Sequence, residues 1–176
     1  MTRQSRIAVV ALTGGVALGI ALTVGTARLV YAGGGFLAAT GVLVALTLAA
    51  LGAGAWGGDP LLNPGASPRL RALALAGALA AGAAFAGLWR GTVSDNALSG
   101  TGALGAMLML AAPAYMAGSL FVSLGMRGPS IAPVAIGGTA IGVLFASNAF
   151  VPLFQPWSAL LLAGSIVGLV VPLAPR

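Results

Sequence analysis

Side chains able to do acid–base, nucleophilic or metal chemistry are very scarce in this chain of 176 residues. Its acidic residues are Asp59 and Asp95, and it has no His, Cys, Lys or Glu. Without cysteine there can be no disulfide, thiolate metal site or cysteine nucleophile. Without histidine, most haem, copper and non-haem iron sites lack their usual ligand, and a serine lacks its usual activating base. We therefore expect no enzyme activity, no metal and no resident cofactor.

The most unusual polar residue is Asn148, which stands within the apolar stretch IGVLFASNAFVPLF (141–154). An amide that faces lipid is costly, whereas one that bonds to a neighbouring helix contributes about 0.6–2 kcal/mol. We expect Asn148 to hold one helix against another, with contact to a ligand as the alternative. Tyr115, Ser119 and Arg28 are the other polar residues that we expect at a packing interface or beside a ligand.

The composition indicates that these residues are positioned by membrane helices. Hydrophobic residues make up 59% of the chain and charged residues 6%, and the mean hydropathy is +1.07. Soluble domains carry about 25% charged residues, so this chain has too few charges to solvate a surface. Its apolar side chains are therefore expected to face lipid.

Six segments are long and apolar enough to cross a bilayer, which takes about 20 residues. They are separated by short stretches rich in Gly and Pro, which interrupt regular structure. The predicted spans are residues 7–26, 36–56, 70–89, 104–124, 131–151 and 157–173. The expected fold is an all-α polytopic membrane protein with one six-helix transmembrane domain over residues 1–176. The first apolar run exceeds a signal peptide's and no cleavage site follows, so we expect it to be retained.

The arginines predict the orientation of the chain in the membrane. With the N-terminus inside, the cytoplasmic side holds most of them: Arg3, Arg6, Arg69, Arg71, Arg127 and Arg176. This agrees with the positive-inside rule and places both termini in the cytoplasm, so we expect the bacterial inner membrane. The basic residues are scattered and not interleaved with aromatics, so the net charge of +6 does not indicate nucleic-acid binding. Asp59 and Asp95 then lie on opposite sides of the membrane and cannot form an acid–base pair.

Small residues recur at four-residue spacing, the pattern that lets membrane helices approach closely. The pairs that we expect to pack are Gly15 with Gly19, Gly138 with Gly142, and Gly164 with Gly168. They predict a tightly packed bundle, either within the chain or with neighbouring chains. Pro113 and Pro133 fall inside predicted spans, where each should kink its helix.

Several short motifs resemble the membrane region of integral-membrane spermidine-synthase-like proteins, itself similar to half of a major facilitator transporter. GVLFASN (142–148) resembles the family's G-x-L-Y-A-x-N pattern, and ARL (27–29) resembles the S/T-R-L that ends its first helix. The stretch from Gly54 through Asp59 to Arg69 and Arg71 resembles the facilitator loop between helices two and three. PAYMAGS (113–119) resembles the family's P-x-x-x-M-G-A/S element in helix four. The resemblance implies a six-helix, facilitator-like packing.

The chain also departs from that family. Thr23 and Thr26 stand where the family places a Glu and a Trp before the first-helix arginine, and the loop between Gly54 and Arg69 is stretched. The cytosolic methyltransferase-like domain, which would hold the aminopropyl donor, is absent from this sequence. We therefore expect a membrane scaffold that does not itself transfer aminopropyl groups.

Two functions are compatible with these features. The first is a non-catalytic membrane subunit that packs against and stabilises a larger complex, such as a respiratory or photosynthetic one. A lipid, quinone or pigment held by apolar contact is compatible with it, and its partners are the bilayer and other integral membrane proteins. The alternative is a half-size facilitator-like transporter that works as a homodimer for a small solute. No acid is predicted inside the membrane, so proton coupling would have no carrier.

Overall fold

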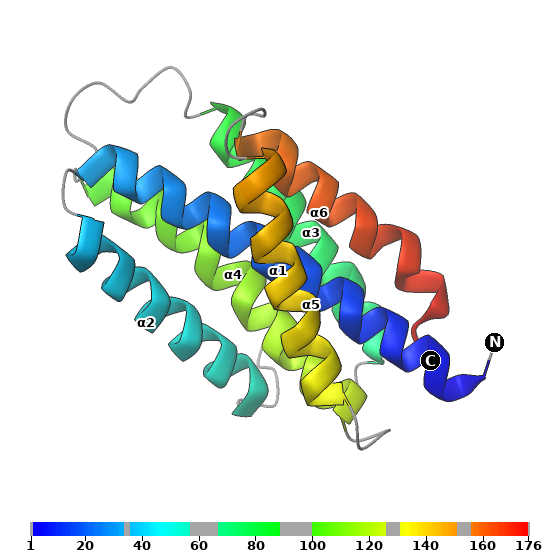
Figure 1. Cartoon of the computed structure of the whole chain (residues 1–176). Helices are drawn as coiled ribbons and strands as arrows, with labels where there is room; N and C mark the ends of the chain where they lie inside the picture. The colour runs from blue at the N-terminus through cyan, green and yellow to red at the C-terminus, as the bar shows by residue number, and fades with distance from the viewer. Residues whose placement is uncertain are drawn as a thin grey trace.

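A computed structural model describes residues 2–33, 36–56, 67–88, 100–125, 131–150 and 156–175, and these residues are almost entirely helical (Figure 1). The helices are α1 (Arg3–Gly33), α2 (Phe36–Trp56), α3 (Pro68–Leu88), α4 (Gly100–Gly125), α5 (Ile131–Phe145) and α6 (Pro156–Val170). A π-helical turn, η2 (Ala146–Phe150), continues α5, and a 3-10 turn, η3 (Val171–Leu173), continues α6. The all-α expectation is confirmed, and each predicted span contains one helix. The first helix is longer than predicted, because it begins at Arg3 and continues to Gly33.

Three helical stretches are long and apolar enough to cross a membrane by length and composition: Arg3–Ala27, Pro68–Ala86 and Ile131–Asn148. The described parts of the other helices contain shorter apolar stretches: Val44–Trp56, Leu110–Gly125 and Trp157–Leu173. The outward side chains are also apolar, as Trp56 at 93% exposed and Leu169 at 79% exposed illustrate. These features are those of a membrane protein, since a water-soluble bundle would present polar residues on this surface.

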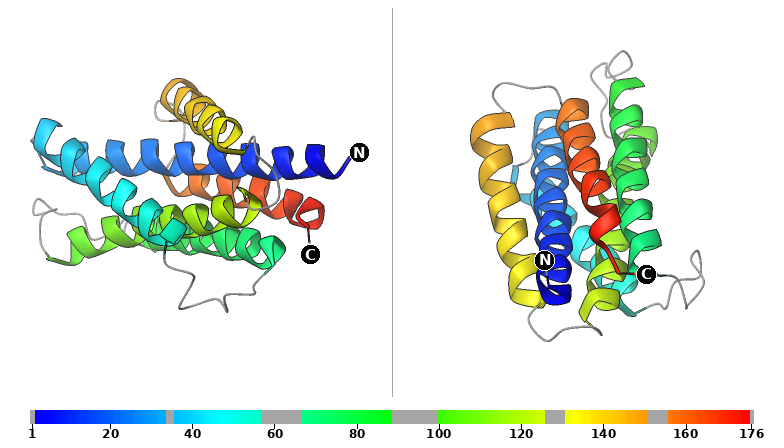
Figure 2. Two further views of the ribbon diagram at one scale, coloured as in Figure 1. Left: turned by 90° about the horizontal axis from the view of Figure 1, so that it is seen from below. Right: turned by 90° about the vertical axis from the view of Figure 1, so that its right-hand side faces the viewer.

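The helices form one bundle in which α1 is central, since it contacts each of the other five (Figures 1 and 2). The most extensive pairings join α1 to α5, α2 to α4 and α3 to α6. Helices α2 and α5 lie on the periphery. The N-terminal and C-terminal ends of the chain lie close together at one end of the bundle (Figure 1).

The helix pairings have a pattern close to twofold. Exchanging α1 with α4, α2 with α5 and α3 with α6 turns the α1–α5 pair into the α4–α2 pair, and the α1–α6 pair into the α4–α3 pair. All four of these contacts are present. The exception is a minor α1–α3 contact, which has no α4–α6 counterpart among the described residues. The first three helices and the last three are therefore packed in similar ways.

The two prolines predicted to kink their spans differ in position. Pro113 is buried in the interior of α4, where its missing N–H removes a helical hydrogen bond. Pro133 lies in the first turn of α5, which begins at Ile131. The first four N–H groups of a helix have no intrahelical partner, so the kink that we expected at Pro133 has no cause.

Candidate functional site

Helices α1 and α5 touch through their backbones at two glycine pairs. A Cβ atom added at Gly15 would lie 2.3 Å from the Ala135 carbonyl oxygen, and one at Gly19 would lie 2.2 Å from that of Thr139. Real Cβ atoms do not come so close to a backbone oxygen. Only glycine therefore fits at these two positions of α1.

The facing helix contributes the second pair. A Cβ atom at Gly138 would lie 2.4 Å from the Leu12 carbonyl oxygen, and one at Gly142 would lie 2.2 Å from that of Val16. We call Gly15, Gly19, Gly138 and Gly142 the α1–α5 seam. At such separations Cα–H groups approach carbonyl oxygens and add weak hydrogen bonds to the van der Waals packing. Both predicted pairs thus pack against each other within the chain.

A second close approach joins α2 to α4. A Cβ atom at Gly54 would lie 2.0 Å from the Tyr115 carbonyl oxygen, and one at Gly118 would lie 2.2 Å from that of Leu51. Tyr115 itself is only partly buried. Gly118 is not part of a glycine pair at four-residue spacing, because Ala114 precedes it by four positions. The sequence pattern therefore does not identify it as a packing residue.

The third pair of glycines behaves differently. A Cβ atom at Gly164 would lie 3.3 Å from the Ala76 carbonyl oxygen, so α6 packs less tightly on α3. Gly168 has open space around it within the described part of the chain. Gly168 is exposed and does not pack against a helix of the described chain, so its packing on a neighbouring chain stays a prediction.

A buried arginine joins α3 to α4. Arg71 is 8% exposed, and its Nη1 donates a hydrogen bond to Oγ of Ser119, which is 1% exposed. Its burial and this hydrogen bond place Arg71 at the contact between α3 and α4, and its part in setting the orientation of the chain stays a prediction.

Asn148 does not bond to another helix among the described residues. It lies exposed in the η2 turn, and its Nδ2 donates to the Leu144 carbonyl oxygen of its own helix at 2.8 Å. A longer contact of 3.4 Å joins Nδ2 to Oγ of Ser147. Asn148 therefore does not join two helices within the described chain, because its side chain is exposed, and contact with a helix of another protein stays a prediction. Within the described chain, no group donates to its Oδ1.

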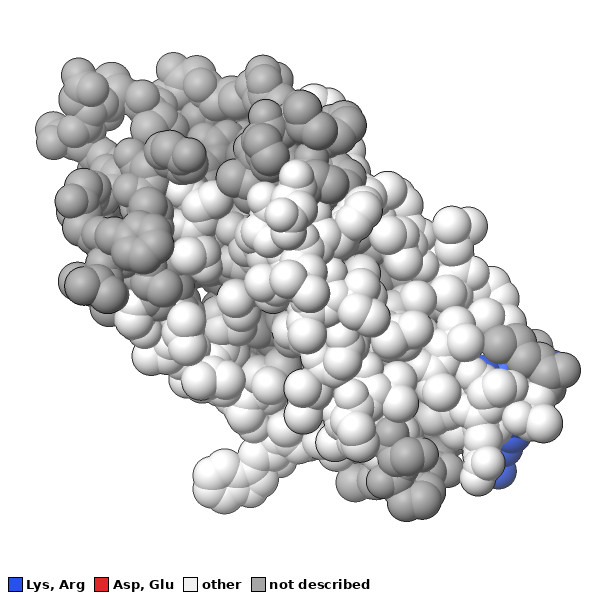
Figure 3. All heavy atoms as spheres, viewed as in Figure 1, with Lys and Arg blue, Asp and Glu red and all other residues white. Residues whose placement is uncertain are grey.

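The described arginines gather at the end of the bundle where the termini lie. Arg3, Arg6 and Arg69 line one cleft of about 610 Å³ together with the last residues of the chain. Among the described residues on the face drawn in Figure 3, all are white except for blue atoms at this end. Arg127 lies outside the described residues, as do both aspartates, and Arg28 is described only through the backbone of α1.

The described residues include no histidine, cysteine, aspartate or glutamate. They contain no group of three His, Cys, Asp or Glu side chains able to hold a metal ion. What they do contain is two close helix contacts, one buried arginine and one basic cleft. No family model matches the chain, and neither a curated protein nor a solved structure is significantly similar to it.

Proposed function

We propose that this chain is a non-catalytic integral membrane subunit that packs against and stabilises a larger membrane protein complex, such as a respiratory or photosynthetic one. The observation that carries the proposal is the outward side of α5 and η2. Gly137, Ile141, Leu144 and Asn148 are all exposed there and recur at intervals of four, three and four residues. We call them the outer α5 face. This spacing is that of a helix–helix packing seam.

The exposed amide of Asn148 supports a protein partner over lipid at this face. Its Nδ2 is satisfied by the chain's own carbonyl, but its Oδ1 receives no donor from the described residues. An unsatisfied polar atom is costly in hydrocarbon, whereas a neighbouring helix can supply the missing donor. Asn148, which we expect to hold one helix against another, is thus better placed to join this chain to a neighbouring one.

We further propose six membrane spans with both termini in the cytoplasm of a bacterium and the chain in its inner membrane. The gathering of Arg3, Arg6 and Arg69 at the end that holds both termini supports this orientation. Along α1, Arg28 follows Arg6 by about 33 Å at a rise of 1.5 Å per residue, close to the thickness of a bilayer core. The near-twofold helix pairing also supports the facilitator-like packing that the spermidine-synthase-like motifs imply, since such folds contain repeats of three helices.

A half-size transporter that works as a homodimer is the second candidate. The observation that favours it is the buried Arg71–Ser119 pair, because charged groups inside membrane bundles often mark a substrate path. A fixed positive charge inside the bundle would suit uniport of an anionic or neutral solute.

The test is purification of the tagged chain from its native host in mild detergent, followed by native mass spectrometry. We expect a stoichiometric assembly with other membrane proteins, and a several-fold lower recovery of it with Asn148→Ala. Ser165→Ala is the matched control, because Ser165 is also exposed and also bonds to a carbonyl of its own helix, at 2.8 Å. A homodimer with nothing else bound would refute the subunit and favour the transporter, which solute uptake by reconstituted vesicles would then test.

A further inference from the structure

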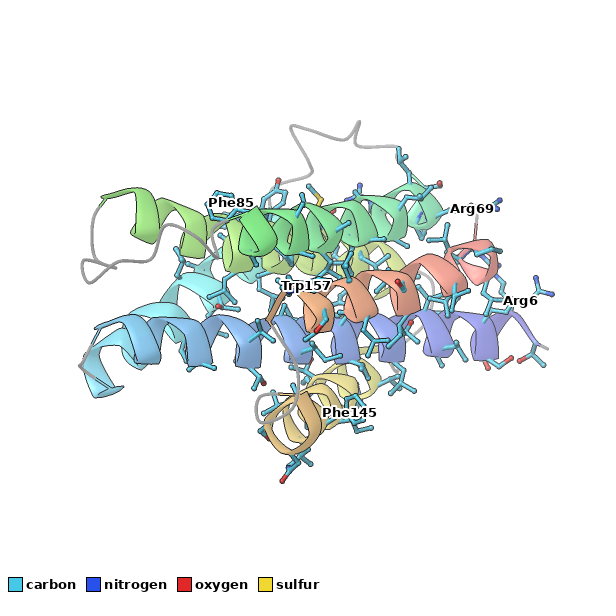
Figure 4. All side chains as sticks on the ribbon, turned by 90° about the horizontal axis from the view of Figure 1, so that it is seen from above. Arg6, Arg69, Phe85, Phe145 and Trp157 are labelled. Atoms are coloured by element: carbon cyan, nitrogen blue, oxygen red, sulfur yellow. The ribbon has the colours of Figure 1, made fainter. Side chains whose placement is uncertain are left out.

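The cleft at the terminal end of the bundle has the make-up of an anion site. Arg3 and Arg6 come from the first turns of α1, and Arg69 comes from the first turn of α3. Figure 4 shows Arg6 and Arg69 at the same end of the molecule with the C-terminal end of α6 between them. The volume of about 610 Å³ falls within the range typical of small-ligand sites.

The positive charges of this cleft are not balanced within the described part of the chain. None of its three arginines makes a salt bridge or side-chain hydrogen bond there, and both aspartates of the sequence lie outside it. Residues three apart on a helix share a face, so Arg3 and Arg6 repel each other. An anion that contacts both guanidinium groups would attract each of them and offset their mutual repulsion.

The N-terminal ends of α1 and α3 contribute less to anion binding than the guanidinium groups do. At the start of α1, the Ser5 backbone N–H donates to Oγ1 of Thr2 at 3.2 Å. At the start of α3, the Leu70 N–H donates to the Ser67 carbonyl oxygen at 2.9 Å. These caps occupy N–H groups that could otherwise bind an anion. The guanidinium groups are therefore the available donors, and each can form two parallel hydrogen bonds to phosphate oxygens.

The remaining lining of the cleft is apolar: Ile7, Pro172, Leu173, Ala174 and Pro175. A wall of this kind beside three arginines suits a ligand with a phosphate at one end and carbon chain at the other. The cleft also lies at the ends of apolar helices, which is the depth of lipid phosphates in a bilayer.

We propose that Arg3, Arg6 and Arg69 form a binding site for the phosphate group of an anionic ligand. The ligand is either a phospholipid with a net negative headgroup or a soluble phosphate. The proposal rests on the membrane placement of the chain and goes beyond the identity of any complex, so it can fail without affecting the subunit proposal.

The test uses the purified, delipidated full chain and native mass spectrometry during titration with phosphatidylglycerol or, separately, phosphatidylcholine. We expect phosphatidylglycerol to bind at least about tenfold more tightly, and Arg6→Gln or Arg69→Gln to weaken it about tenfold. Ser165→Ala changes an exposed side chain of α6 that does not line the cleft and should leave binding unchanged. Arg3→Gln changes an exposed side chain, so it provides a variant whose folding is not in question.

Inorganic phosphate distinguishes the two sources. Failure of excess phosphate to displace phosphatidylglycerol assigns the site to lipid. Displacement by phosphate, with phosphate binding itself lost in Arg69→Gln, assigns it to a soluble ligand. The proposal is overturned if Arg3→Gln, Arg6→Gln and Arg69→Gln all bind both probes as the wild type and Ser165→Ala do. Equal affinity for the two lipids together with no phosphate binding would also overturn it.

Discussion

Two adjacent glycines of α5 provide the sharpest test of the packing described above. Gly138 belongs to the α1–α5 seam, whereas a Cβ atom at Gly137 would meet nothing within 4 Å in the described structure. The substitutions Gly138→Ala and Gly137→Ala make the same chemical change on the same helix. Only Gly138→Ala should nevertheless lower the free energy of unfolding.

The magnitude for Gly138→Ala follows from the atoms that the new methyl group would meet. The Leu12 carbonyl oxygen lies 2.4 Å away, the carbonyl carbon of the same residue 3.2 Å, and the Val16 nitrogen 3.2 Å. All are backbone atoms and cannot rotate aside, so α1 and α5 must separate by about 1 Å to reach ordinary contact. A gap of that size forfeits a quarter to a half of each dispersion contact across the seam. We expect a loss of about 2–3 kcal/mol, within the range for overpacked sites.

Gly137→Ala should leave the free energy of unfolding unchanged or raise it by up to about 1 kcal/mol, because alanine restricts the unfolded chain and favours the helix. The assay is reversible unfolding of the purified chain in mixed micelles by titration with a denaturing detergent, followed by far-ultraviolet circular dichroism. Equal unfolding free energies for the two variants, within about 0.5 kcal/mol, would refute the close α1–α5 contact.

The same unfolding assay checks three further expectations. Ser119→Ala removes an acceptor from a buried guanidinium and should cost about 1–3 kcal/mol, whereas Ser123→Ala, which loses only a bond to its own helix, should cost less than about 0.5 kcal/mol. Gly54→Ala should cost about 2–3 kcal/mol and Gly52→Ala nothing, and equal effects would contradict the α2–α4 contact. Asn148→Ala should change the free energy of unfolding of the isolated chain by less than about 0.5 kcal/mol. A loss above about 1 kcal/mol would indicate that Asn148 holds helices of this chain together.

The helices could be predicted from the sequence because hydropathy is a sum over neighbouring residues and needs no tertiary information. The seam residues could be predicted for the same reason, since the four-residue spacing of Gly15 and Gly19 is local. Their partners could not, because the choice of α5 over another helix depends on the packing of the whole bundle. Gly168 shows the limit of the pattern, since it has the same spacing from Gly164 and yet faces outward.

The polar residues were harder to place because a helix has two sides and hydropathy does not distinguish them. For Arg71 the sequence places the residue at the start of a span but does not identify its partner, which is Ser119 on another helix. For Asn148 the sequence predicts contact with a second helix, whereas Nδ2 donates to the Leu144 carbonyl oxygen of its own helix. In both cases the partner depends on the direction of the side chain, which the local sequence does not determine.

The two sides of α5 separate the stability of the chain from its assembly with a partner. The inner glycines, Gly138 and Gly142, pack directly against the backbone of α1, so no other helix can contact them. On the outer side, Gly137, Leu144 and Asn148 contribute no described contact that the fold requires. A methyl group at Gly137 should therefore not destabilise the isolated chain. It should prevent close contact with a partner helix if one docks on this face. A variant that folds normally and assembles poorly is the outcome that only a docking role for the outer α5 face explains, because lipid adapts to a methyl group and a packed helix does not.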